Sequence, residues 1–483
     1  MFLVAEEQRK DCVKSYLVEK GYRVNDHALG IISACDDWYA NRPIKDFHTR
    51  KNLNNEEIKL SRLNFAKRCC ADDANLCEVI SVTPEKESTS QEFIDNIIKS
   101  NRFDTMYRKQ LEKTAAIGTV GAYVYLRNAD LMEDSKGVIS LRGGDIRINY
   151  CDGDCIIPLT VENDEVIECG FSATNTVRGV QKTTLVIFTI NNGQYSAETV
   201  VFNEHGEKID NECSIVILGD IKPFSIMRVA EVNNLDDMEG YGLPKIWNTI
   251  PFFKALDLAY NLLYGDLDKG DKLIFINELL ACIQRDPQTN EAYLTPQQKK
   301  LFILLGEKLP DEKNLVQEYN PELRVQTLTE IFELVLSLIS MQFGYGTKKY
   351  TFEKTGQIKT ATEYIGEKQD EMQELNKQRK QATEYILGLI KAAMWFSNTF
   401  QGTSYNLDEN LVIEFDDSYV EDKAAKLERL RADALSFPEI KELTVWYMRD
   451  AYQLSEEEAK EMVEKALSNN DFDADDEEIE GGE

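Results

Sequence analysis

The hydrophobic and polar positions near the N-terminus predict a mainly helical start. Residues 5–20 and 26–40 carry apolar side chains at helical spacing, so we expect an opening pair of helices. A further helix is expected within residues 57–82, ending in a short β-prone run. Two more follow, one capped by Ser90 with an apolar face and one over residues 105–116.

The pattern then changes to short runs rich in β-branched and aromatic residues, which indicate strands. Turn-forming pairs such as Gly143-Gly144 and Asp152-Gly153 separate these runs, and the polar segment 233–244 forms their boundary. We expect a β-rich insert of about seven strands on a helical base. The runs are 122–128, 138–142, 145–150, 166–173, 183–190, 195–202 and 213–218.

Two apolar helices with a small lobe between them are predicted next. The first is expected to begin at Pro251, because proline is tolerated in the first turn of a helix. The second covers residues 327–343 and has a similar length, so we expect it to run back along the first. The intervening residues 273–323 contain shorter, mixed elements and predict a small lobe.

A basic loop and a long polar helix follow the second apolar helix. Within residues 344–359 four lysines accompany one acid, Glu353, and composition alone favours an ordinary surface loop whose lysines balance nearby acids. The helix from Thr360 to about residue 398 would span roughly 60 Å. Its polar first half, residues 366–381, is expected to face water or another subunit. The four lysines are Lys348, Lys349, Lys354 and Lys359.

The C-terminal part predicts a strand, two helices and an acidic tail. A β-prone run covers residues 411–415, and Pro438 divides the helical pattern of residues 419–468 into two helices. The second contains a capping box that starts at Ser455. Residues 471–483 include eight acids and no base, so we expect them to be disordered.

Composition limits the classes of function. The formal net charge is −30, from 55 basic and 85 acidic residues, which argues against a surface that grips nucleic acid over its whole area. The ten cysteines have no repeating spacing, and the N-terminus lacks the pattern of a signal peptide, so reduced intracellular thiols are expected. The most apolar run, residues 334–343, is too short to cross a bilayer, and no membrane association is expected.

Motifs for chemistry are weak. Residues 265–272 keep part of a Walker A spacing but place Asp271 where the phosphate-binding lysine belongs. The segment Cys151-Asp-Gly-Asp-Cys155 fits a turn between strands better than a metal site. The adjacent acids Asp36/Asp37 and Asp236/Asp237 could hold Mg²⁺ for phosphodiester chemistry, although such pairs are far more often solvated surface. We expect no enzyme activity, no cofactor and no resident metal.

The order of several segments resembles the portal protein family of tailed bacteriophages, in the branch from long-tailed phages of Gram-positive hosts. The early Trp38-Tyr39, followed by Pro43 and His48, resembles the opening of that family. Residues 98–103, with the small-residue turn and strand of residues 116–123, resemble its entry into the β region. The resemblance covers about residues 25–470.

Two later segments carry the same resemblance. Gly240-Tyr-Gly-Leu-Pro244, followed by the helix that contains residues 256–260, is similar to the family's first stem helix. Tyr350-Thr-Phe352, leading through Gly356 into residues 359–364, is similar to its tunnel loop and long wing helix.

The resemblance implies an α+β portal fold, with a helical and β-rich wing, a two-helix stem, a small α/β clip, a long wing helix and a helical crown. The implied division is 1–249 wing, 250–272 first stem helix, 273–323 clip, 324–343 second stem helix, 344–359 tunnel loop, 360–417 long wing helix and closing strand, 418–470 crown and 471–483 acidic tail.

It also implies a function: a ring, typically of twelve subunits, at one capsid vertex of the virion, assembled in the host cytoplasm, through which double-stranded DNA enters and later leaves. The implied partners are the large subunit of the terminase, the major capsid and scaffolding proteins, and the head–tail connector or adaptor. The four loop lysines are the expected DNA contacts. The clip is the expected docking surface, with Gln288, Asn290, Glu291 and Tyr293.

Two other functions stay open. One is a metal-dependent nuclease or phosphodiesterase that uses the acid pairs. The other is an oligomeric virion scaffold without a DNA channel. For the portal function, replacing both Lys348 and Lys349 with alanine is expected to leave ring assembly intact and to alter packaging or DNA retention.

Overall fold

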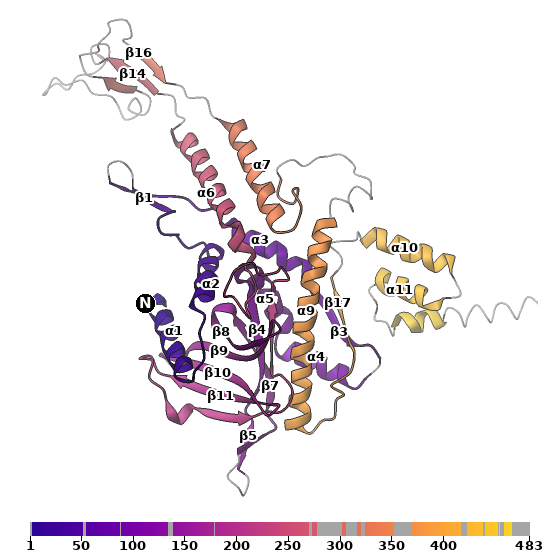
Figure 1. Cartoon of the computed structure of the whole chain (residues 1–483). Coiled ribbons are helices and arrows are strands. Elements are labelled where there is room, and N and C mark those ends of the chain that lie inside the picture. Colours follow the sequence, from indigo (N-terminus) through magenta and orange to yellow (C-terminus); the bar gives the residue numbers. More distant parts are fainter. Residues whose placement is uncertain are drawn as a thin grey trace, which may run out of the picture. The chain divides into compact units, whose positions relative to one another are not determined.

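The computed structural model (Figure 1) describes most of the chain, in two units that comprise Met1–Ile413 and Glu414–Glu483. It combines helices with several sheets, so the α+β prediction is confirmed. The described residues are 2–51, 55–86, 88–133, 139–177, 179–269, 273–277, 302–305, 316–319, 324–351, 369–416, 423–437, 440–452, 454 and 458–465.

The first unit begins with the predicted pair of helices, α1 (Phe2–Glu19) and α2 (Asp26–Tyr39). The helix expected within residues 57–82 is shorter than predicted. A two-stranded ribbon of β1 (Thr49–Lys51) and β2 (Glu57–Lys59) comes first, and α3 covers only Phe65–Ala74. The backbone between β2 and α3 cannot be helical because it is hydrogen-bonded to side chains of another helix, at Ser61 and Leu63.

Three further elements complete this helical layer: β3 (Val79–Pro84), α4 (Ser90–Ser100) and α5 (Phe103–Ile117). The prediction that Ser90 caps its helix is wrong. Ser90 is the first residue of α4, and its hydroxyl donates to Glu409 at 2.5 Å. The buried hydroxyl is thus used in a contact with a distant segment that the local sequence does not reveal.

Ten strands follow in the described residues of this region, three more than expected, since β5, β8 and β13 lie outside the predicted runs. The five-stranded sheet has the order β12-β11-β10-β9-β8, and a three-stranded sheet has the order β13-β4-β7. The strands are β4 (Thr119–Arg127), β5 (Asp130–Glu133), β6 (Ile139–Arg142), β7 (Asp145–Asp152), β8 (Ile156–Glu162), β9 (Glu165–Val177), β10 (Val180–Asn191), β11 (Gln194–Phe202), β12 (Ser214–Ile217) and β13 (Phe224–Arg228).

The core of this region lies on both faces of the five-stranded sheet. On one face, Phe171 and Phe188 pack with Phe224 of β13, with ring centroids 5.6 Å apart in both pairs. On the other face, Val13 and Leu17 of α1 pack on strand residues of β8, β10 and β11. Alternating apolar positions therefore bury β8, β10 and β11 on both sides, whereas Ile215 and Ile217 of β12 are exposed.

The Gly-rich segment before α6 is explained by a close approach of two backbones. Gly118 has φ +79°, and a Cβ on it would lie 2.3 Å from the Gly242 carbonyl oxygen. The Gly242 amide donates to the Thr119 hydroxyl at 2.8 Å, and the Tyr241 hydroxyl donates to the Ile156 carbonyl at 2.8 Å. Only glycine allows these chains to touch, so the motif fixes where α6 begins.

The two apolar helices are α6 (Lys245–Lys269) and α7 (Val325–Gln342), which pack side by side (Figure 1). The expected start at Pro251 is wrong, because α6 begins at Lys245, directly after Pro244. In the sequence between these helices, three strands form a sheet with the order β15-β14-β16. They are β14 (Leu273–Asn277), β15 (Phe302–Leu305) and β16 (Val316–Tyr319).

After residues 324–351 the described chain resumes in α9 (Gln369–Phe396), which packs on β13 and β4. The boundary of the first unit falls within β17 (Leu411–Phe415), which is paired with β3. The second unit contains α10 (Lys423–Ser436), as predicted, and α11 (Lys441–Tyr452). The second predicted helix is divided, because α11 ends at Tyr452, Leu454 is not helical and residues 458–465 form a separate helical segment. Ser455, the predicted start of a capping box, lies outside the described residues. A small core of Val445, Ala459 and Val463 holds this unit together.

Candidate functional site

The candidate site lies where α6, α7 and the residues after α7 meet, and its first feature is exposed apolar surface. Beyond Ala259, no described residue of α6 is buried. On α7, Leu334 is 62% exposed. Along these outer parts, the sides of the two helices that do not face each other lack cover, and their exposed apolar residues are together called here the stem stripe. It comprises Leu262, Tyr264, Leu267, Val325, Ile331 and Leu334.

An ion pair joins the far end of α6 to the start of α7. The Arg324 guanidinium donates to both carboxylate oxygens of Asp266, from Nε at 2.9 Å and from Nη2 at 2.6 Å. A bidentate pair fixes orientation as well as distance. It holds the two helices together at the point where the chain leaves them for the small sheet.

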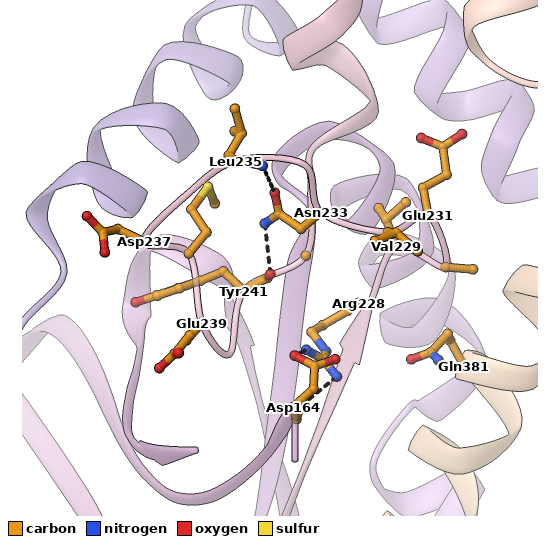
Figure 2. A pocket seen from close by; sticks show the side chains of 14 residues that line it. Asp164, Arg228, Val229, Glu231, Asn233, Leu235, Asp237, Glu239, Tyr241 and Gln381 are labelled. Carbon is orange, nitrogen blue, oxygen red and sulfur yellow. Dashed lines mark hydrogen bonds and ion pairs between the residues drawn. The ribbon is translucent and has the colours of Figure 1, made fainter. Parts of the chain in front are cut away.

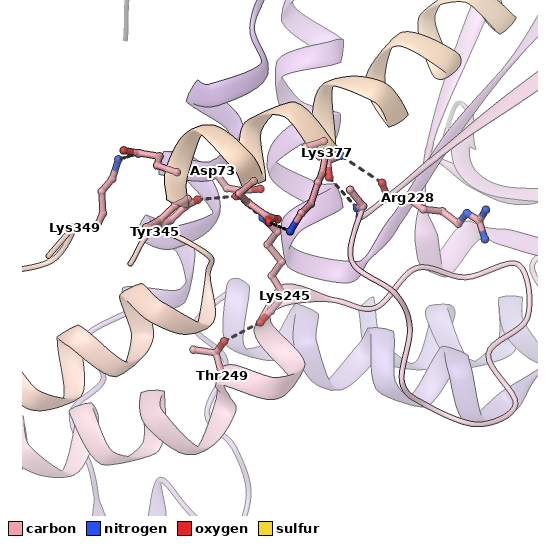
Figure 3. A network of polar contacts seen from close by, with 11 residues as sticks. Asp73, Arg228, Lys245, Thr249, Tyr345, Lys349 and Lys377 are labelled. Carbon is pink, nitrogen blue, oxygen red and sulfur yellow. Dashed lines mark hydrogen bonds and ion pairs between the residues drawn. The ribbon is translucent and has the colours of Figure 1, made fainter. Parts of the chain in front are cut away.

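A buried ion network lies at the other end of α6 (Figure 3). The Lys245 side chain is only 1% exposed, and its ammonium lies 2.8 Å from Asp73 of α3 and 2.9 Å from Glu374 of α9. The Tyr345 hydroxyl donates to the same Asp73 oxygen at 2.6 Å. One lysine thus joins three elements that are far apart in the sequence, and Tyr345 adds the segment after α7.

The network keeps its charges despite burial. Burial by itself lowers the pKa of the Lys245 ammonium, but Asp73 and Glu374 outweigh it and raise that pKa above its ordinary value. For Glu374, burial raises the pKa, but the contact with Lys245 outweighs it and the pKa is lowered. Burial raises the pKa of the nearby Glu231 carboxyl, which Lys245 only partly offsets. Lys245 and Glu374 therefore stay ionised at neutral pH.

The residues after α7 are held to this network by their side chains. Gly344 has φ +81°, and a Cβ there would lie 3.1 Å from the Glu374 side chain. The Tyr350 hydroxyl donates to Asp72 at 3.2 Å, and the Lys349 amide donates to the Ser340 hydroxyl at 3.1 Å. The first part of the predicted basic loop, residues 344–351, is therefore an ordered segment fastened to α3 and α9.

The predicted DNA-contact lysines have different surroundings. The Lys349 ammonium pairs with Glu371 and lies 5.2 Å from the centre of the Tyr345 ring, and its side chain is 17% exposed. Lys348 is exposed. Lys354 and Lys359 lie outside the described residues, as do the predicted clip contacts Gln288, Asn290, Glu291 and Tyr293. Their roles stay predictions.

The expectation that the polar half of the long helix faces water or another subunit is wrong for one face of it. Glu371, Glu374 and Gln378 are buried within the chain. The Gln378 side chain accepts from the Ala230 amide at 3.0 Å and donates to the Arg228 carbonyl at 3.3 Å. These polar residues at positions i, i+3 and i+7 serve an internal interface.

A second buried pair, which the sequence did not indicate, lies beside α6. His48 Nε2 is 3.0 Å from Asp257, and both side chains are at most 7% exposed. The Ile44 amide donates to His48 Nδ1 at 2.9 Å, so Nε2 carries the proton and donates to Asp257. Trp38 stacks on Phe253 next to this pair, with ring centroids 6.1 Å apart.

A cavity of about 370 Å³, lined by both polar and apolar residues, lies beside the segment that leads to α6 (Figure 2). Arg228 donates to Asp164 there at 2.8 Å, and Asn233 joins the Leu235 amide to the Tyr241 carbonyl. Glu231, Asp237 and Glu239 also line it. The contacts of Asn233 fold the loop back on itself, so the cavity follows from the loop's shape.

Of the two acid pairs considered for metal chemistry, Asp236 and Asp237 are both exposed, whereas Asp36 and Asp37 contact bases. Arg42 lies 3.0 Å from Asp36 and 2.8 Å from Asp37, and Lys113 is 2.8 Å from Asp36. Across the described part of the chain, no group of three or more His, Cys, Asp or Glu residues is arranged to hold a metal ion. Residues 151–155 form the predicted turn, between β7 and β8.

Among the described helices, none is long and apolar enough to span a membrane.

Comparison with known proteins gives similarity in structure alone. No protein-family model matches the chain, and no curated protein matches it. A chain in the neck of an empty GTA particle, computed with C6 symmetry, is similar at a TM-score of 0.37 and 11% identity, over 76% of this chain and 85% of that chain. A chain in the neck of a native GTA particle, computed with C12 symmetry, is similar at a TM-score of 0.38 and 11% identity, over 79% and 89%.

Proposed function

We propose that this chain is a portal-type subunit that forms a ring at one vertex of a tailed-phage virion and lines a channel for DNA. The observation that carries the proposal is the stem stripe, which a single chain leaves exposed on α6 and α7. Repetition of the two helices around an axis would bury each stripe against a neighbour and make a rigid tube. The order of segments that resembles portal proteins is consistent with this arrangement.

The ordered start of the basic loop supports a DNA-contact role in such a ring. Lys348 is exposed on a segment that Tyr345 and Tyr350 fasten to α3. A ring of these lysines would touch phosphates while the acidic chain around them keeps the duplex from binding tightly. Transient contact of this kind permits movement of DNA, whereas tight binding would stop it.

The remaining partners follow from the same proposal. The small sheet between α6 and α7 would dock the terminase motor and later a head–tail connector, and the outer parts would contact capsid and scaffolding proteins. ATP hydrolysis would come from the terminase, so this chain needs neither enzyme activity nor a cofactor. We place the ring in the virion, with assembly in the host cytoplasm.

Electron microscopy of the purified full chain tests the proposal. The expected result is a ring whose central pore is wide enough for duplex DNA. A monomer at micromolar concentration, or a closed particle without a pore, would contradict it. Mg²⁺-dependent cleavage of DNA by the pure protein would instead favour the nuclease function.

Two single variants separate the roles of the loop lysines. Lys349→Ala removes the partner of a buried carboxylate, Glu371, so we expect the free energy of unfolding to fall by about 1–3 kcal/mol. Lys348→Ala should change it by less than about 0.5 kcal/mol and should lower DNA retention in particles. Chemical unfolding and the DNA content of assembled particles measure the two effects. Unchanged retention in the Lys348 variant would remove this lysine as a DNA contact.

A further inference from the structure

The β1–β2 ribbon, residues 49–51 and 57–59, is a second surface that the chain leaves without cover. Its strands pair Thr49 with Lys59, Arg50 with Ile58 and Lys51 with Glu57. None of these six residues is buried, and Ile58 is 46% exposed. A two-stranded ribbon is marginally stable by itself in water, so an exposed one needs support from elsewhere.

The base of the ribbon is fixed to α6. The Ser61 amide donates to the Asn261 side chain at 2.9 Å, and Asn261 donates back to the Ser61 carbonyl at 2.8 Å. The Leu63 amide donates to Asp257 at 2.9 Å. With His48 bonded to the same carboxylate, both ends of the ribbon are attached one helical turn apart on α6. The residues that flank the ribbon are therefore fixed to α6, whereas no residue of the two strands is buried.

The ribbon is next to the stem stripe. Asp257, Asn261 and Tyr264 follow one another at spacings of four and three residues, so they lie on one side of α6. Tyr264 is 57% exposed and belongs to the stem stripe. Three residues per strand give a reach of about 10 Å, and neighbouring helices pack about 8–10 Å apart. The ribbon can therefore reach a helix that packs beside α6.

The charges of the two surfaces are complementary. Three bases and one acid stand on the two strands: Arg50, Lys51, Lys59 and Glu57. The outer parts of α6 and α7, with Arg324 before α7, carry four acids, Asp266, Asp268, Glu330 and Glu333, against two bases, Lys269 and Arg324, and Arg324 is already bound to Asp266. In a chain with a net charge of −30, a basic ribbon beside an acidic hairpin favours contact between copies.

We propose that the ribbon is an arm that docks on the α6–α7 hairpin of a second copy of this chain. The contact places Ile58 against the neighbour's stem stripe, and Lys51 and Lys59 near its acids. The contact between neighbouring subunits would then include the β1–β2 ribbon as well as α6 and α7. The proposal rests on the ring of the proposed function, and the experiment below distinguishes failure of the one from failure of the other.

Hydrogen exchange of the full chain tests the arm. Amides in the peptide 49–60 should exchange at least about tenfold slower in the assembled ring than in a non-assembling Leu334→Asp chain. If a ring forms but this peptide exchanges at the same rate as in the single chain, the arm proposal is wrong and the proposed function is unaffected. Absence of any ring overturns the proposed function and the arm with it.

A charge reversal provides a second measurement. Lys51→Glu with Lys59→Glu should raise the subunit concentration at which half the rings have dissociated, by about tenfold at low salt. Lys99→Glu with Lys109→Glu, at exposed lysines on α4 and α5, is the matched control with the same change in net charge and should leave that concentration within about twofold. Equal effects of the two changes would overturn docking by the arm.

Discussion

Lys245→Met should lower the free energy of unfolding by about 3–5 kcal/mol, the largest effect expected for a single side chain outside the apolar core. Methionine fills a similar volume but leaves Asp73 and Glu374 facing each other without the ammonium between them. Both carboxylates are buried, so water cannot replace the lost partner. Chemical unfolding followed by circular dichroism measures the loss.

Two controls separate the network from general effects of removing a lysine. Lys254→Met, on the same helix, removes a cation that lies 5.5 Å from the Phe47 ring and should cost about 1 kcal/mol or less. Lys245→Met combined with Asp73→Asn and Glu374→Gln should recover much of the stability, because no buried charge is then left unpaired. If the triple variant is no better than the single one, loss of packing rather than of charge explains the effect.

The same network predicts a pH dependence. The pKa of Glu374 is lowered in the folded chain, so its contribution is present above the ordinary glutamate pKa and is lost as the pH falls through the lowered value. The stability difference between the native chain and Glu374→Gln should therefore be full at pH 7 and shrink below about pH 4. A difference that stays constant over this range would contradict the ionised pair.

The helices and most strands of the first unit could be predicted because each has a local signal. α2, α5 and α7 carry apolar residues at helical spacing, and β10 and β11 contain runs rich in β-branched and aromatic residues. The β1–β2 ribbon was missed because three-residue strands give no period, and its pairing depends on side chains of α6 more than 190 residues away.

The site was only partly predictable for a related reason. Lysines in residues 344–359 indicated a basic segment, but Lys349 is neutralised by Glu371, on a helix whose polar face the sequence assigns to water. The spacing of Glu371, Glu374 and Gln378 was the available signal, because one polar face at i, i+3 and i+7 can also meet buried bases. Whether this face of α9 meets water or Lys245 depends on the tertiary structure, in which Lys245 of α6 lies beside Glu374 of α9.

Leu334→Asp should prevent ring assembly while leaving the single chain folded. Leu334 is 62% exposed in one chain, so an aspartate there meets water and should change the free energy of unfolding by less than about 0.5 kcal/mol. In a ring, the same position lies in the stem stripe, where losing the buried leucine costs about 1.5–3 kcal/mol and a buried charge adds to it. A cost of about 3 kcal/mol per contact raises the concentration needed for assembly roughly a hundredfold.

Ile80→Asp is the matched control for this change. Ile80 is 61% exposed on β3, outside the stem stripe, and the substitution introduces the same charge at an equally exposed apolar position. Light scattering after size exclusion should give rings for the native chain and for Ile80→Asp, and single chains for Leu334→Asp at the same concentration. Rings of unchanged size in the Leu334 variant would mean that α6 and α7 do not form the contact between copies, because a charge cannot be buried there at no cost.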